Sequence, residues 1–499
     1  MTKANYQGFV QQLQKVFDVQ ASIALLNWDQ ETYMPKGGAA QRSRQISTLS
    51  AYAHELFTDP AFKSLVRTLK DNLDSLSTSE QVNIKETYKQ IARAEKLDAA
   101  FVSKRSECIS ATYQSWIKAR AEKNYSIYEQ QLQQLIELKK EEADRIGYTG
   151  HPYNALLEEF EPGMDCKQLD RIFQGVKDHL NPLLKQILAK AAPDDGFMRR
   201  NYDKDKQWDF GIDLLKGMGY DFDRGRQDLS IHPFTTGFGA DDIRVTTRVN
   251  EHNLASMVWS CIHEGGHALY EQGLPSSDYG LPTGKYISLG IHESQSRLWE
   301  NHVGRSSAYW NHNFKLAQSY FPEQLHEVGA HDFYAACNKI EASPIRTEAD
   351  ELTYHFHVMI RYEIEKELIT GNLSTKDAEA YWNEAYKTYL GLNISDPNQG
   401  ILQDIHWSLG SLGYFPTYSI GSFYAAQFYA AAGQAIEDLE LQIAQGDTSQ
   451  LLSWLQQRIY EQGMHYSAEE LAIAVTGEPL NYDYFKAYTA KKYGALYDL

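Results

Sequence analysis

The sequence predicts a mainly α-helical protein with one small β-sheet near its middle. Between Gly38 and Gly147 there is no glycine, and Pro60 is the only proline, so long helices can run there without a breaker. In the N- and C-terminal parts, apolar residues recur at three- and four-residue steps, which is the period of an amphipathic helix. Only residues 241–250 are instead rich in β-branched side chains, which favour a strand.

The helical pattern is clearest before residue 147 and after residue 352. Near the end of the glycine-free stretch, one helical stripe contains Tyr128, Leu132, Leu135, Ile136 and Leu138, and Gly147 is placed to end that helix. The same pattern predicts helices over residues 352–392 and 422–460. The second of these ranges is alanine-rich, which also favours helix.

The predicted strand has the sequence "DDIRVTTRVN", residues 241–250. It follows the loop-like "HPFTTGFGA" and precedes a predicted helix. A peptide that lies antiparallel to an edge strand gains main-chain hydrogen bonds without recognition of its side chains. Two interpretations are therefore open: an edge that binds a peptide, and a purely structural β-turn unit.

The composition is that of a globular protein and excludes some partners. Of the 499 residues 42% are apolar and 23% charged, and the formal net charge is −18. An acidic chain repels phosphate backbones, so we expect no nucleic acid as a partner. No run approaches the eighteen or so apolar residues of a membrane span, so we expect no membrane partner. The four cysteines lie far apart, which favours a reducing, cytoplasmic location.

The segment "SCIHEGGHALYEQGL" contains His263, Glu264 and His267 in an H-E-x-x-H pattern. On a helix the two histidines lie one turn apart on one face, where both imidazoles can bind one metal ion, and Glu264 is placed as general base. The glycines between them, Gly265 and Gly266, disfavour helix by about 1 kcal/mol each relative to alanine. The flanking apolar periodicity still predicts a helix, and we expect the glycines to let a neighbouring group approach closely.

A catalytic zinc ion needs three protein ligands and one open position. In "YISLGIHESQSRLWENH", Glu293 follows the histidine pair after a loop rich in glycine and proline. That separation suits a second helix packed against the first, which would supply a carboxylate ligand. His292 stands beside it, and the spacing alone leaves both residues open as the third ligand.

Several further motifs accompany this pattern along nearly the whole chain. They are "LLNWDQETYMP" (25–35), "HPF" (232–234), "DIRVT" (242–246), "HEGGH" (263–267), "HESQ" (292–295), "IRTEAD" (345–350), "GILQDIHW" (400–407) and "GYFPTYSIG" (413–421). In content and order they resemble the carboxypeptidase Taq family of zinc metallocarboxypeptidases. A set of ordered motifs is far more specific than H-E-x-x-H alone.

The resemblance implies a two-lobed, saddle-like helical zincin, similar to neurolysin, with a deep central groove. It implies a divalent metal, normally Zn²⁺ with Co²⁺ as a substitute, and Glu293 rather than His292 as the third ligand. It also implies a homodimer that removes single residues from peptide C-termini with broad specificity. We treat residues 1–499 as one catalytic unit: a helical part (about 1–230), a metal- and substrate-binding core (231–421) and a helical C-terminal part (422–499).

An exopeptidase must also hold the terminal carboxylate of its substrate, and the planar fork of arginine binds a carboxylate through two parallel hydrogen bonds. Arg346 in "IRTEAD" is the first candidate. The alternative is a structural ion pair with Asp350, four residues on along a helix. Arg244 and Arg297 are weaker candidates, and Arg297, one turn after Glu293, is also placed to brace that ligand.

Peptide hydrolysis further needs a donor to the oxyanion of the tetrahedral intermediate. His406 and Tyr418 are the candidates, since related zincins place a histidine and a tyrosine opposite the metal. Tyr414 is the second choice of tyrosine and a substrate-binding candidate. His232 in "HPF" either lines the same groove or caps a turn.

Three functions are compatible with these motifs. The first is a zinc carboxypeptidase with Glu264 as general base. The second is another zinc peptidase, such as an oligopeptidase that cleaves internally, which shares the metal site but lacks the carboxylate anchor. The third is a non-catalytic helical protein that binds a structural metal or none.

Overall fold

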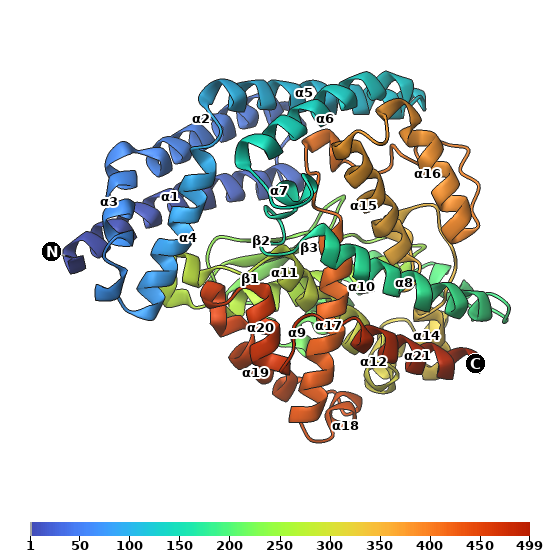
Figure 1. The fold of residues 1–499 in the computed structure, drawn as a ribbon. Coiled ribbons are helices and arrows are strands. Elements are labelled where there is room, and N and C mark those ends of the chain that lie inside the picture. The colour runs from blue at the N-terminus through green and yellow to red at the C-terminus, as the bar shows by residue number, and fades with distance from the viewer. Residues whose placement is uncertain (1) are drawn as a thin grey trace.

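The computed structural model describes residues 2–499 and is built mainly of helices (Figure 1). The glycine-free stretch forms consecutive helices, three of which begin at side-chain caps, Asp59, Ser77 and Asp98. The predicted stripe of the last one is buried, and that helix ends at Gly147. The N-terminal helices are α1 (Thr2–Thr32), α2 (Ala39–Thr58), α3 (Pro60–Lys70), α4 (Thr78–Ala94), α5 (Ala99–Glu122) and α6 (Ser126–Ile146).

Three strands form the small sheet in the order β1-β3-β2, reached after helices α7 (Tyr153–Leu157), α8 (Cys166–Ile187) and α9 (Lys204–Met218). The strands are β1 (Gly225–Leu229), β2 (Thr235–Gly237) and β3 (Ile243–Thr247); β1 is parallel and β2 antiparallel to β3. The predicted strand is confirmed as β3, but it is the central strand, so the interpretation of β3 as a substrate-binding edge is wrong. The edges are β1 and β2. Strand β2 lies inside the stretch predicted as loop, where glycine and proline obscure a strand of three residues.

The remaining helices contain the two predicted helical regions. Residues 352–392 form two helices separated at Gly371, which has a φ of 81°. Residues 422–460 fall in three helices, because the chain breaks at Asp438 and Gly446, both with positive φ. In order these helices are α10 (Leu254–Gly273), α11 (Leu289–Arg297), α12 (Ser307–Tyr320), α13 (Pro322–Leu325), α14 (Ala330–Cys337), α15 (Tyr354–Thr370), α16 (Thr375–Leu390), α17 (Pro416–Ala435), α18 (Leu439–Ala444), α19 (Ser449–Arg458), α20 (Ala468–Thr476) and α21 (Asp483–Tyr497).

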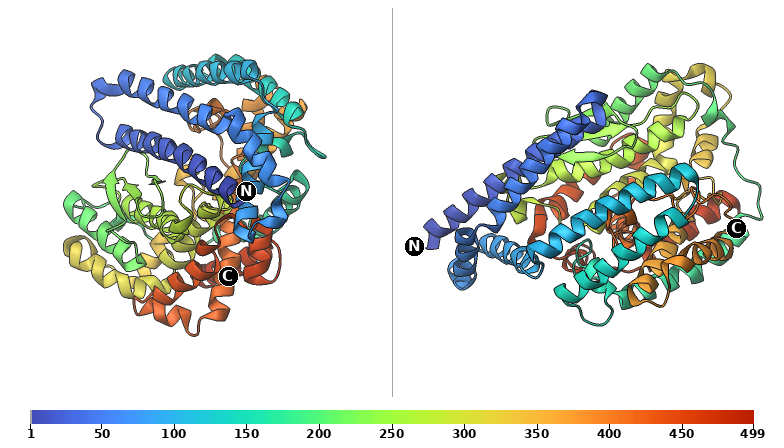
Figure 2. Two further views of the ribbon diagram at one scale, coloured as in Figure 1. Left: turned by 90° about the vertical axis from the view of Figure 1, so that its left-hand side faces the viewer. Right: turned by 90° about the horizontal axis from the view of Figure 1, so that it is seen from above.

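Among residues 3–499, buried apolar side chains form two separate cores. The larger core contains residues from Ala119 to Tyr497, including the sheet, α10, α11 and α17. The smaller core lies in α1, α3 and α4, and Leu281 joins it from the loop between α10 and α11. The long helices α1 and α2 lie side by side along one flank of the molecule (Figure 2). The mainly helical class with a small sheet is thus confirmed, while the deep groove and the three-part division stay predictions.

Two further findings concern membrane-spanning helices and the cysteines. Within residues 2–499, no helix has both the length and the hydropathy to cross a bilayer. All four cysteines are free thiols, and Cys166, Cys261 and Cys337 are buried.

Candidate metal and substrate site

The H-E-x-x-H segment lies on a helix despite its two glycines. Helix α10 begins after Asn253, whose side chain accepts a hydrogen bond from the Ser256 N–H, and runs without a break through the histidines. Its apolar residues at three- and four-residue steps are buried in the larger core. The rings of His263 and His267 therefore lie on one face, with centroids 4.9 Å apart.

The two glycines permit close packing on two sides of α10. A Cβ at Gly266 would lie 2.7 Å from the Cα of Ser296 and 2.8 Å from the carbonyl oxygen of Gln295, which are backbone atoms of α11. A Cβ at Gly265 would lie 2.7 Å from a methyl group of Leu215 on α9. Since backbone atoms cannot move aside, Gly266 sets the distance between the two helices.

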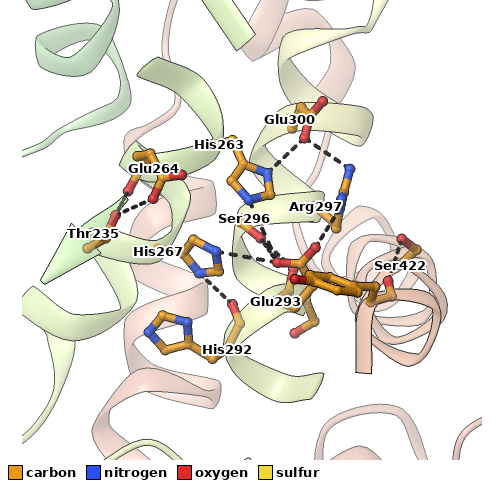
Figure 3. A network of polar contacts seen from close by, with 12 residues as sticks. Thr235, His263, Glu264, His267, His292, Glu293, Ser296, Arg297, Glu300 and Ser422 are labelled. Carbon is orange, nitrogen blue, oxygen red and sulfur yellow. Dashed lines mark hydrogen bonds and ion pairs between the residues drawn. The ribbon is translucent and has the colours of Figure 1, made fainter. Parts of the chain in front are cut away.

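This close approach places Glu293 of α11 beside both histidines (Figure 3). Its Oε2 lies 3.7 Å from Nε2 of His263 and 3.4 Å from Nε2 of His267. One ligand atom from each of the three side chains lies within 4.8 Å of the other two. The structure therefore brings together the three predicted ligands, His263, His267 and Glu293.

The other ring nitrogen of each histidine is occupied. Nδ1 of His263 is 2.8 Å from Oε2 of Glu300, and Nδ1 of His267 is 3.1 Å from the backbone oxygen of His292. Because both acceptors take a proton from Nδ1, the Nε2 atom of each ring is the one that faces Glu293, where a metal ion would bind (Figure 3).

The ring of His292 is directed elsewhere. Its Nε2 is 2.9 Å from Oε1 of Glu271, and the ring stacks on His267 with centroids 4.4 Å apart. His292 thus contributes its backbone oxygen to the orientation of His267, while its neighbour Glu293 completes the cluster.

The cluster fits a divalent transition metal. Two nitrogens and one carboxylate oxygen are a ligand set typical of zinc, and ligands about 2.1 Å from a tetrahedral ion lie about 3.4 Å apart. The two nitrogen–oxygen distances, 3.7 and 3.4 Å, match that spacing. Burial, and then His292, lower the pKa of His267 to about 3, so that ring is neutral and able to bind a metal at neutral pH.

Glu293 and Glu300 are held by arginines on the same helical segment. Arg297 donates from Nε to Oε1 of Glu293 at 2.7 Å and from Nη1 to Glu300 at 3.3 Å, which confirms that it braces the carboxylate. Arg305 donates to Glu300 at 2.9 Å. Glu300 lies in the π-helical turn Leu298–Gly304 that follows α11. π-Helical turns are frequent at functional sites.

Glu264 points away from the three ligands and towards the sheet (Figure 3). Its Oε2 accepts a hydrogen bond of 2.7 Å from the hydroxyl of Thr235 on β2. The side chain is buried, and burial raises the pKa of Glu264. Thr235 therefore fixes a carboxylate whose pKa is moved towards neutrality, as a general base requires.

A second cluster contains Arg346, His406, Tyr414 and Tyr418. Nε2 of His406 is 3.1 Å from the hydroxyl of Tyr418, and the Arg346 guanidinium lies 4.7 Å from the Tyr418 ring centroid. The rings of Tyr414 and Tyr418 are 5.3 Å apart. A Cβ at Gly421 would lie 2.5 Å from Cγ of Glu293, so α17 packs directly on α11 and brings this cluster beside the metal ligands.

The alternative predicted for Arg346, a structural ion pair with Asp350 along a helix, is wrong. Arg346 lies in a short 3₁₀ turn rather than an α-helix, so Asp350 is not one helical turn away. Its Nε instead donates to Asp404 at 3.0 Å, and Nη1 donates to the Tyr354 hydroxyl at 3.0 Å. Asp350 accepts from Thr353 and from the Glu341 backbone. Within residues 2–499, Nη2 of Arg346 has no hydrogen-bond partner.

Two predicted substrate residues lie outside both clusters. Arg244 on β3 donates twice to Asp242, at 2.9 and 2.8 Å, and its guanidinium lies 4.5 Å from the Trp28 ring centroid. His232 is an exposed residue between β1 and β2, and its carbonyl accepts from the Ser230 hydroxyl. Its place agrees with the turn interpretation.

Sequence reasoning missed four residues: Thr235, Glu300, Arg361 and Asp404. Asp404 stands in the quoted motif "GILQDIHW", but its partners Arg346 and Arg361 lie 58 and 43 residues earlier. Thr235 and Glu300 stand 29 residues before and 37 residues after their partners, Glu264 and His263. Contacts at such separations produce no periodic signal in the sequence.

Known proteins resemble the chain over its full length. The model of the carboxypeptidase Taq (M32) metallopeptidase family matches residues 8–493. Thermostable carboxypeptidase 1 of Thermus thermophilus is 37% identical over 508 residues, with 99% of each chain covered. The crystal structure of the M32 carboxypeptidase from Deinococcus radiodurans R1 is 37% identical with a TM-score of 0.97, covering 99% of this chain and 100% of that one. A solved structure named CHT is 51% identical with a TM-score of 0.97, covering 98% and 99%.

Proposed function

Because the chain belongs to the carboxypeptidase Taq (M32) family of metallopeptidases, we propose that it is a zinc-dependent carboxypeptidase that releases C-terminal amino acids from peptides with broad specificity. The observation that supports this most directly is the cluster His263, His267 and Glu293. The second is the buried Arg346, whose Nη2 has no hydrogen-bond partner in the part of the chain that the structure describes.

The three ligands would hold Zn²⁺, for which Co²⁺ could substitute. The bound ion would polarise the scissile carbonyl and lower the pKa of the attacking water. Glu264 accepts the proton of that water and later transfers it to the leaving nitrogen. The hydroxyl of Thr235 donates to Oε2 of Glu264 and so keeps the carboxylate in place. The other oxygen, Oε1, is then left to take the proton in both steps.

Arg346 would bind the terminal carboxylate of the peptide. Its side chain is buried, and Asp404 and Tyr354 fix its plane through Nε and Nη1. A carboxylate that reaches Nη2 finds a rigid donor whose plane is already set, so little conformational entropy is lost on binding. Tyr414, whose ring lies 5.3 Å from that of Tyr418, would contact the substrate. Arg244 and His232 lie outside both clusters, and we assign them no direct contact with the substrate.

Tyr418, supported by His406, would stabilise the oxyanion. Burial, and then Arg346, lower the pKa of His406 to about 4, so the ring is neutral at neutral pH. We assign the proton of the neutral His406 to Nε2, which then donates to the oxygen of the Tyr418 hydroxyl. The single O–H of Tyr418 is then left to donate to the oxyanion, in the low-dielectric site where such a donor is most effective.

Paired peptides test the carboxypeptidase function. A set of peptides with free C-termini and the same peptides with C-terminal amides would be incubated with the metal-loaded enzyme, and the products identified by mass spectrometry, with and without a chelator. We expect stepwise loss of single C-terminal residues from the free acids alone, abolished by the chelator. Equal cleavage of the amides, or internal fragments, would instead establish the oligopeptidase alternative.

Two further properties belong to this proposal. Metal analysis of the purified protein should give about one zinc per chain, the stoichiometry of a three-ligand catalytic site. Light scattering should give the mass of a homodimer, as the resemblance implies. Cytoplasmic location is part of the same proposal, since free, buried thiols suit a reducing compartment.

A further inference from the structure

Asp404 is shared by two buried arginines. Its Oδ1 accepts from Nε of Arg346 at 3.0 Å, and its Oδ2 accepts from Nε of Arg361 at 2.6 Å. Both guanidinium groups also face the ring of Phe415, with centroid distances of 5.6 and 5.4 Å. The three charged groups therefore form one compact unit with two positive charges and one negative charge.

Arg361 does not face the substrate. Its side chain is 0% exposed, on α15. Nη1 donates to the backbone oxygen of His357 at 2.7 Å, and the guanidinium lies over the Trp382 ring. Whatever Arg361 contributes to substrate binding must therefore act through Asp404 and Arg346.

The titratable groups beside the unit do not cancel its charge. Burial, and then Arg361, hold the pKa of His357 well below its usual value, so this ring is neutral. His406 is neutral, as described above. Glu365, one turn after Arg361, accepts hydrogen bonds from Tyr153, Trp407 and the Gly413 backbone. Burial raises the pKa of Glu365 to about 7, so it is protonated below neutral pH. At pH 6 the unit therefore keeps a net charge of about +1.

We propose that Arg361 is a positioning residue for C-terminal specificity. By holding one oxygen of Asp404 and balancing its charge, Arg361 leaves Arg346 with an uncompensated positive charge for the terminal carboxylate of the substrate. Without Arg361, Asp404 would neutralise Arg346, and the anchor would lose its preference for an anion. The inference depends on the proposed function, in which Arg346 binds that carboxylate.

The test measures KM and kcat separately at pH 6 for a free-acid peptide, and the rate for its amide. Arg361→Met removes the charge and keeps much of the side-chain volume. We expect its KM for the free acid to rise roughly tenfold or more, because the net positive charge that attracts the terminal carboxylate is lost from the unit. Kcat and bound metal should change little. The double variant Arg361→Met/Asp404→Asn restores a net charge of +1, and its KM should return to within about threefold of the wild-type value, well inside that tenfold change.

Two controls separate charge from packing. Arg361→Lys keeps the charge but not the planar fork, and should also keep KM near the wild-type value. Arg105→Met removes one of two cations from a buried carboxylate elsewhere, since Arg105 and Lys139 both pair with Glu142, and should leave KM unchanged. If Arg361→Met does not fold, the double variant and Arg361→Lys still decide the question.

The outcomes separate a failure of the proposed function from a failure of the role assigned to Arg361. If the wild-type enzyme cleaves the amide as well as the free acid, the proposed function itself fails. If the wild type prefers the free acid but Arg361→Met keeps a normal KM, Arg361 has no part in specificity. If the double variant and Arg361→Lys are as impaired as Arg361→Met, Arg361 is a packing residue and the inference is overturned.

Discussion

Glu264 combines a fixed position with a raised pKa, and both features come from its neighbours. Thr235 holds one carboxylate oxygen, and burial disfavours the charged form. We expect Glu264→Gln to fold and bind metal like the wild type, because glutamine accepts the same hydrogen bond. Its kcat should fall by about 10²- to 10⁴-fold, the usual contribution of a general base. Steady-state kinetics together with metal analysis check this, and full activity in the variant would exclude the proposed mechanism.

The carboxyl group of Glu161 is also buried. It lies against the first residues of α11, the helix that contains Glu293. The Ser288 hydroxyl donates to it at 3.1 Å, and both of its oxygens would lie 2.7 Å from a Cβ at Gly290. Burial raises the pKa of Glu161 from 4.5 to about 7. The folded protein thus keeps a proton that the unfolded chain releases near pH 4.5, so through this group the free energy of unfolding falls as pH rises from about 4.5 to 7.

Glu161→Gln has no proton to release and should remove that loss. The free energy of unfolding of the variant minus that of the wild type should increase by roughly 2 to 3 kcal/mol between pH 5 and pH 8. Urea unfolding of both proteins at equal metal concentration measures the difference. A difference that stays constant over this range would mean that Glu161 is ionised in the folded protein at both pH values.

At the residue scale, the sequence predicted the residues that combine a motif with helical spacing. His263, Glu264 and His267 lie on one helix, and Glu293 lies on the next. The residues that hold these side chains and Arg346 in place could not be predicted from the sequence, because Thr235, Glu300 and Asp404 reach the site only through tertiary packing. For the same reason the proposed ion pair between Arg346 and Asp350 was wrong: the spacing of four residues matters only if the backbone is helical.

At the scale of the element, the contact between α10 and α11 depends on the absence of a side chain at Gly266. A Cβ at Gly266 would meet the backbone of Gln295 and Ser296 at 2.8 and 2.7 Å. We expect Gly266→Ala to push α11 away, to lower the free energy of unfolding by about 1 to 3 kcal/mol and to weaken metal binding, because Glu293 moves with α11. Chelator competition and thermal unfolding measure the two effects.

Gly433 supplies the matched control. It lies in helix α17, is exposed, and a Cβ there would have no atom within 4 Å among residues 2–499. Gly433→Ala should therefore stabilise the protein slightly, by up to about 1 kcal/mol, through the helix propensity of alanine. If Gly266→Ala behaved like this control, the close approach of α11 would have no role in the metal site.

The elements themselves were largely predictable, and their ends were not. Long periodic stretches identified helices such as α6, since burial of one face is a local property of the sequence. Breaks at Asp438 and Gly446 were missed because apolar residues at helical spacing lie on both sides of each break. The place of β3 in the sheet could not be inferred either, because β1 and β2 are short and resemble the loops beside them.

At the scale of the whole molecule, the two cores imply two levels of stability. The larger core includes every element that holds a predicted metal ligand. The smaller one has nine buried residues, Phe9, Leu13, Phe62, Val66, Leu69, Leu76, Ile84, Ile91 and Leu281. Eight of them belong to the N-terminal helices and the turn between α3 and α4, so Leu281 is the apolar link between this core and the loop that precedes α11. A small core of this kind can open while the remainder stays folded.

Leu281→Ala tests this link. Removal of a buried leucine side chain costs about 2 to 5 kcal/mol, and here the cost should fall on the smaller core. We expect amide hydrogen exchange in α1, α3 and α4 to accelerate by about 30-fold or more, while exchange in α10 and α17 stays at the wild-type rate. The bound metal should be retained, since its ligands lie in the larger core. Equal acceleration in α10 would instead show that the two cores unfold as one unit, and that the loop containing Leu281 transmits changes in the N-terminal helices directly to the metal site.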